Sequence, residues 1–77
     1  KILSVDVARF GDDQTVIGTR QGRKATVLKK YHGLDTVQVA ERTIEFIIQE
    51  KPRAVVVDGD GLGAGVVDQL RARVQVL

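Results

Sequence analysis

The chain has 77 residues, with twelve Lys and Arg against ten Asp and Glu, and it contains no Cys, Met or Trp. This length allows one domain at most, and the lack of cysteine excludes disulfides and thiolate zinc sites. A net charge of +2 is too small to indicate a nucleic-acid binder by itself. No apolar run approaches the roughly 20 residues that cross a bilayer, so we expect no membrane partner.

The first half of the chain has the alternating pattern of a β-meander. Leu3, Val5 and Val7 share one side of the first strand, and polar or small residues occupy the other. Residues 21–23 are typical of a hairpin loop. The predicted strands are residues 2–8, 15–19 and 25–32.

Helical periodicity follows. Asp35 is a suitable N-cap, Gln38 completes a capping box, and Pro52 limits this helix to about residue 50 or 51. The apolar residues of this helix recur every three or four positions, which predicts one apolar face. They are Val37, Ala40, Ile44, Ile47 and Ile48.

The last part of the chain predicts a strand, a helix and the start of another strand. Residues 54–57 are an apolar run ending at Asp58, which is typical of a strand buried on both faces. The glycine-rich segment 59–65 leads into a helix over 66–73, and 74–77 begins a further strand. The order βββαβα(β) predicts an α/β fold with a mixed sheet, in which the fourth strand lies parallel to the first.

Two acidic residues stand out against this pattern. Asp6 interrupts an apolar strand, where an unpaired buried carboxylate costs several kcal/mol, and Asp58 ends another strand. If these strands are parallel neighbours about 4.8 Å apart, both carboxylates project near one sheet edge. Such a pair suits Mg²⁺ or Mn²⁺, which activate water for phosphodiester cleavage. The structural alternatives are an ion pair or a turn cap for Asp6, and a cap on the glycine turn for Asp58.

Five basic residues and no acidic residue occupy positions 20–30. A basic stripe of this kind can bind phosphates, including those of DNA. A solvated hairpin is an equal alternative, because edge strands carry Lys and Arg to resist aggregation. The residues are Arg20, Arg23, Lys24, Lys29 and Lys30.

The glycine-rich segment has other possible meanings. Gly59, Gly61 and Ala64 match the spacing of a dinucleotide fingerprint, but the match is short and the acidic partner expected about 20 residues later would lie past Leu77. The Gly-Lys-Ser/Thr ending of a P-loop is absent, and Leu62 stands where a calcium loop needs Asp or Asn. The simpler interpretation is a tight passage of the backbone between strand and helix. His32, the only histidine, is expected at the surface.

Two runs of the chain resemble the nuclease domain of phage terminase large subunits. Residues 5–17 (VDVARFGDDQTVI) are similar to the opening of that domain, and residues 55–70 (VVVDGDGLGAGVVDQL) resemble its second signature. The two runs occur in the right order, with a basic hairpin and one helix between them. The resemblance covers essentially the whole chain.

The resemblance implies an RNase H-like fold, truncated at its C-terminal end, and a two-metal endonuclease that cuts concatemeric viral DNA during packaging. Asp6 matches the metal ligand of the first strand, and Asp58 matches the acidic residue that ends the fourth. Asp13 and Asp60 are assigned supporting roles. The third acidic ligand of the family lies on a downstream helix, and no residue here matches it.

We therefore expect residues 1–77 to be one partial nuclease domain, without the motor ATPase domain, that is inactive on its own. The parent protein is expected in the host cytoplasm, as a bacteriophage or prophage protein. Its expected partners are double-stranded DNA, the small terminase subunit and the portal. Two other functions remain open: an actin-like or sugar-kinase-like nucleotide-binding half, and a non-catalytic structural or interaction domain.

Overall fold

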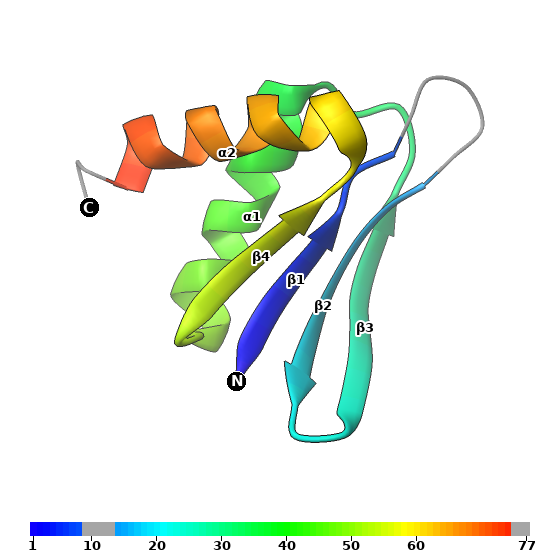
Figure 1. Cartoon of the computed structure of the whole chain (residues 1–77), viewed down its shortest axis with the longest axis vertical. Helices are drawn as coiled ribbons and strands as arrows, with labels where there is room; N and C mark the ends of the chain where they lie inside the picture. Colours follow the sequence, from blue (N-terminus) through cyan, green and yellow to red (C-terminus); the bar gives the residue numbers. More distant parts are fainter. Residues whose placement is uncertain (9–13, 75–77) are drawn as a thin grey trace.

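A computed structural model of the chain describes residues 1–8 and 14–74, except for the side chains of residues 60 and 61. It is an α/β fold, a mixed four-stranded sheet with two helices (Figure 1). The predicted order of three strands, a helix, a strand and a helix is confirmed. The elements are β1 (Ile2–Asp6), β2 (Thr15–Gln21), β3 (Lys24–Tyr31), α1 (Thr36–Glu50), β4 (Ala54–Asp58) and α2 (Asp60–Val74).

The strands lie in the order β3-β2-β1-β4. β1 pairs antiparallel with β2, and β2 with β3, whereas β1 and β4 are parallel, as the crossover through α1 predicts. The parallel register places Leu3 opposite Val55 and Asp6 opposite Asp58. Beyond the strand ends, the Val7 amide donates to the Asp58 carbonyl at 2.8 Å. The two strands therefore remain paired up to the point where both aspartates stand.

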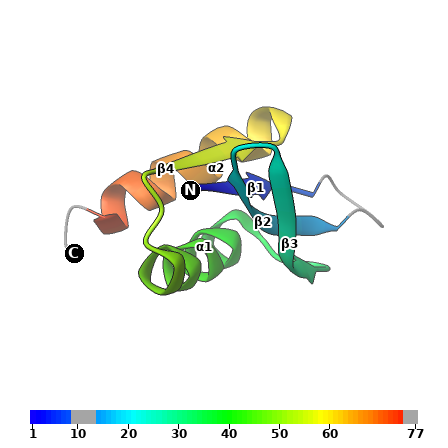
Figure 2. The same cartoon turned by 90° about the horizontal axis from the view of Figure 1, so that it is seen from below.

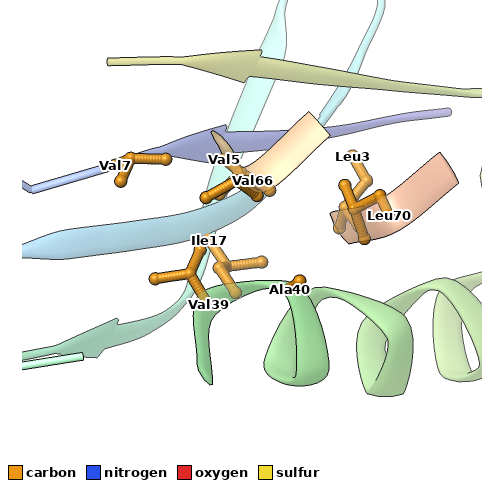
Figure 3. Packing of buried hydrophobic residues seen from close by; sticks show 8 residues of the cluster. All are labelled: Leu3, Val5, Val7, Ile17, Val39, Ala40, Val66 and Leu70. Carbon is orange, nitrogen blue, oxygen red and sulfur yellow. The ribbon is translucent and has the colours of Figure 1, made fainter. Parts of the chain in front are cut away.

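The core lies on the side of the sheet that faces the helices, and α1 runs along this side (Figure 2). Alternate residues of β1 point into the core, as predicted, and both helices contribute to it (Figure 3). No described element covers the opposite side of the sheet, which we call the open face. The buried hydrophobic residues are Leu3, Val5, Val7, Ile17, Val39, Ala40, Val66 and Leu70.

The prediction that the fourth strand is buried on both faces is wrong. Residues of β4 alternate between half-buried and exposed, and Val56 on the open face is 53% exposed. An apolar run marks two buried faces only where a second layer is present. Here the helices supply a layer on one side alone, so β4 is apolar on a face that the described chain leaves open.

The start and end of α1 agree with the prediction. The Gln38 amide donates to Asp35 Oδ1 at 2.7 Å, and the Asp35 amide donates to Gln38 Oε1 at 2.9 Å, which is the capping box. The helix ends at Glu50, and Lys51 follows in the left-handed conformation, donating its amide to the Ile47 carbonyl at 2.9 Å.

The predicted apolar face of α1 is wrong in part. Val37 and Ile48 are 37% and 60% exposed, whereas Val39, Ala40 and Thr43 are fully buried. The helix packs against both β1 and α2. The residues that it buries are therefore rotated around the helix axis relative to the predicted face. Thr43 tolerates burial because its hydroxyl donates to the Val39 carbonyl at 2.8 Å.

The second helix begins earlier than predicted. α2 starts at Asp60, and the Gly63 amide donates to the Gly59 carbonyl at 2.9 Å in its first turn. The glycine-rich segment is therefore mostly helix, and only Gly59, with φ of 136°, forms the tight turn after β4. Val74 is the last residue of α2 rather than the start of a strand, and the rest of the predicted strand, 75–77, lies outside the described residues.

An ion pair joins the start of β1 to the end of α1. Lys1 Nζ lies 3.1 Å from Glu50 Oε1, and Gln49 Nε2 donates to Glu50 Oε2 at 2.9 Å. Hydrogen bonds from the side chains of Gln49 and then Lys1 lower the pKa of Glu50 below its ordinary value of 4.5. Folding therefore favours the ionised carboxylate.

We expect Glu50→Gln to lower the melting temperature at neutral pH. The difference in melting temperature from the wild type should become smaller as the pH is lowered. A lowered pKa in the folded state stabilises the fold above the unfolded value, and this contribution is lost as pH falls through the folded pKa. Melting curves of both proteins between neutral pH and pH of about 3 measure the difference. Glu45→Gln, which removes an exposed acid of the same helix, is the control. A difference that is constant with pH contradicts the assignment.

Candidate metal centre on the open face

Asp6 is the last residue of β1 and belongs to its open side, because Leu3 and Val5 point to the core. The carboxylate is exposed, so the cost expected for a charge inside an apolar strand does not arise. Ser4 and Ile2 precede it on the same side. None of the described basic side chains forms a salt bridge with Asp6.

Asp58 is the last residue of β4 and stands directly opposite Asp6 in the parallel register. Opposite residues of a parallel pair project to the same face from strands about 4.8 Å apart. The predicted neighbourhood of the two aspartates is therefore confirmed in the backbone. Both side chains are exposed on the open face.

One oxygen of Asp58 also caps the turn that follows β4. The Gly59 amide donates to Asp58 Oδ1 at 2.9 Å, so the structural alternative for this residue is real. A carboxylate has two oxygens with about four lone-pair sites, so this one hydrogen bond leaves most of them available. The cap fixes the orientation of the carboxylate and does not exclude a ligand.

The two aspartates line a hollow of about 330 Å³ on the open face. Carboxylates are hard oxygen ligands, and Mg²⁺ is usually bound by one or two of them together with water and substrate phosphates. The residues therefore fit a hard divalent cation that keeps several positions for other ligands. The hollow is lined by Ile2, Ser4, Val5, Asp6, Arg20, Val56 and Asp58.

A closed, all-protein cation cage is not found in the part of the chain that the structure describes. No group of three or more His, Cys, Asp and Glu side chains lies close enough to hold a metal there. Asp13 lies outside the described residues, and Asp60 opens α2 with a side chain that is also outside them. The supporting roles of these two residues stay predictions.

The basic residues of the hairpin are exposed and are divided between the two sides of the sheet. Arg20 lines the hollow together with the two aspartates. Lys30 is also on the open face, because it is opposite Val16, and Val16 is opposite Asp6. The other basic positions lie elsewhere. Lys29 is opposite buried Ile17, Lys24 is opposite Gln21, and Arg23 is in the turn.

Ser4 and Val56 line the hollow and were not identified as site residues from the sequence. The strand alternation that places Ser4 on the side of Asp6 was a signal that could have found it. His32 is exposed, as predicted, and its Nε2 lies 2.8 Å from Gln14 Nε2.

The fold and the hollow define a class of protein: a small α/β domain that presents two adjacent carboxylates on the uncovered face of a mixed sheet. Comparisons of the chain with family models, with curated proteins and with solved structures give no match. Among the described helices, neither has the length and apolar character needed to span a membrane.

Proposed function

We propose that this chain is part of an RNase H-like nuclease domain of the phage terminase type, with Asp6 and Asp58 as metal ligands. In the parent protein this domain cuts concatemeric DNA by hydrolysis of phosphodiester bonds. The observation that carries the proposal is the register pair of Asp6 and Asp58 at the ends of neighbouring parallel strands. The strand order β3-β2-β1-β4, with α1 as the crossover, adds support.

Each residue of the hollow has a distinct role in this proposal. Asp6 and Asp58 supply carboxylate oxygens on the same face, and the Gly59 amide holds Asp58 in one orientation. Mg²⁺ or Mn²⁺, when bound, supplies positive charge to the phosphate and lowers the pKa of the attacking water. No element of the described residues covers this face, which leaves room for a polymer as large as duplex DNA to approach the aspartates there.

The resemblance adds the wider setting of the proposal. The proposed site includes the third acidic ligand that the family carries on a downstream helix, which no residue of these 77 matches. The parent protein acts in the host cytoplasm with the small terminase subunit and the portal.

We expect Mn²⁺ to raise the melting temperature of the chain, and Asp6→Asn and Asp58→Asn to abolish this rise. A ligand that binds only the folded state at ten times its Kd stabilises by about 1.4 kcal/mol. That corresponds to roughly 6–11 °C for a chain of this size. Asparagine keeps the size of the side chain and an oxygen that accepts the Gly59 amide, so the folded chain is retained.

Asp68→Asn, which removes an exposed acid of α2 outside the hollow, is the matched control and should keep the full rise. The proposal fails if Mn²⁺ leaves the wild-type melting temperature unchanged, or if the Asp6 variant responds like the wild type. Titration with Mg-ATP in the same assay tests the nucleotide-binding alternative, for which we expect no stabilisation beyond that of Mg²⁺ alone.

A further inference from the structure

We propose that Arg20 is a phosphate-binding residue that holds the nucleic-acid backbone beside the position of the two aspartates. The inference rests on the proposed function for the nature of the ligand, a phosphodiester chain. Its own basis is a separate observation: a basic side chain from β2 lines the same hollow as Asp6 and Asp58. Of the five basic residues in the hairpin, only Arg20 lines this hollow.

The backbone register sets the distance between the two ends of the hollow. Arg20 is opposite Ile2, and Asp6 lies four residues further along β1, which is about 13 Å at the rise of a strand. By register, the two aspartates therefore belong to one end of the hollow and Arg20 to the other.

Two small residues, Ser4 and Gly18, lie between these ends on the side of β2, and Val56 completes their row on β4. Ser4 is opposite Gly18, midway between the pair that contains Arg20 and the pair that contains Asp6. A Cβ atom at Gly18 would lie 2.6 Å from the Thr26 carbonyl oxygen, at the irregularity where β2 and β3 shift register. The close approach of β3 therefore keeps the Gly18 position free of a side chain, so nothing projects from β2 between Arg20 and the pair of Asp6 with Val16.

Arg20 does not form an ion pair with either aspartate. The structure shows no salt bridge between Arg20 and either Asp6 or Asp58, although all three are described and line one hollow. A guanidinium forms paired hydrogen bonds with phosphate, and carboxylates bind phosphate only through a cation. A ligand that satisfies both ends carries two anionic groups in series, as a nucleic-acid backbone does.

The test is binding of a fluorescent double-stranded DNA oligonucleotide to the 77-residue chain in Mg²⁺, measured by anisotropy at several salt concentrations. We expect Arg20→Ala to weaken binding about tenfold and to reduce the slope of log K against log salt by about one, as for one lost phosphate contact. Arg20→Lys should keep the slope and lose part of the affinity, because lysine lacks the planar fork. Lys24→Ala and Lys29→Ala remove the same charge from the other side of the sheet, because their partners on β2, Gln21 and Ile17, do not share the face of Arg20. We expect them to change affinity by less than about twofold, as surface substitutions away from a contact do.

The inference is overturned if Arg20→Ala binds like the wild type, if the two lysine variants lose as much affinity, or if the wild type does not bind DNA at low salt. The Mn²⁺ melting assay distinguishes a failure of this inference from a failure of the proposed metal site. Arg20→Ala should retain the Mn²⁺ response, since Arg20 is not a metal ligand. If the response to Mn²⁺ is absent while Arg20→Ala still weakens DNA binding, the metal proposal fails and the phosphate contact stands.

Discussion

Alanine in place of Gly59 is expected to destabilise the chain by about 3–5 kcal/mol, a large part of the total stability of a domain this small. Gly59 has φ of 136°, a conformation that side chains rarely adopt. A Cβ atom there would also lie 2.8 Å from Val7 Cβ and 2.9 Å from the Val7 carbonyl oxygen. Strain and overlap therefore add, and thermal unfolding followed by circular dichroism should show a melting temperature lower by roughly 15–30 °C.

Gly22→Ala is the matched control for this substitution. Gly22 has φ of 61°, but no atom lies within 4 Å of the position that a Cβ would take. Alanine at this position would have backbone strain but no steric overlap, so we expect the free energy of unfolding to fall by about 1–2 kcal/mol. Equal losses at the two glycines would show that the approach to Val7 has no energetic weight.

The effect at Gly59 extends to the candidate metal centre. Gly59 follows Asp58 and contacts Val7, which follows Asp6, so it lies where the two strand ends come together. Any alanine variant that still folds has to move one strand end relative to the other. We therefore expect the Mn²⁺ response to be weaker in this variant than in Gly22→Ala.

Leu3→Ala is expected to cost about 2–5 kcal/mol, because it removes one of the largest fully buried side chains among the described residues and leaves a cavity. Leu3 lies on β1, between the strands β2 and β4, and packs in the cluster to which both helices contribute. Urea unfolding measures the change as a lower midpoint with an unaltered slope.

Ile48→Ala is the control for the core substitution. Ile48 is 60% exposed on α1, and we expect its replacement to cost less than about 1 kcal/mol. A similar loss at both positions would contradict the burial of Leu3 and the exposure of Ile48. The comparison also checks the corrected apolar face of α1, since the sequence pattern placed Ile48 inside.

Local signals in the sequence predicted much of this fold. The alternation in β1 identified the buried side of that strand, and the capping box fixed the start of α1. The crossover through one helix correctly predicted that β4 lies parallel to β1. These features depend on neighbours in sequence or on general rules of chain connection, so one chain is enough to find them.

The remaining features depend on contacts that the sequence does not encode locally. An apolar run such as 54–57 does not show whether one or two layers cover it, and the glycines that begin α2 are poor helix formers. At Gly65, a Cβ would lie 3.3 Å from Thr36 Cγ2, so close packing of the two helices explains glycine inside this helix.

The candidate site was predictable to a similar extent. The sequence predicted that Asp6 and Asp58 lie close together if their strands are parallel neighbours, and the register of β1 and β4 places the two residues opposite each other. The separation of Arg20 from Lys29 was not predictable, because the register shift beside Gly18 changes which residues of β3 share a face. The metal and the nuclease activity stay proposals.

The parallel pairing of β1 with β4 has a consequence for how the chain folds. The β2–β3 hairpin and α1 join residues close in sequence, whereas β1 and β4 bring together residues separated by most of the chain. Closing so long a loop costs entropy, so local structure forms first and the non-local strand pair late. We therefore expect the two carboxylates to meet only when folding is nearly complete. A ligand that bridges them therefore lengthens the lifetime of the folded chain and leaves its rate of folding unchanged.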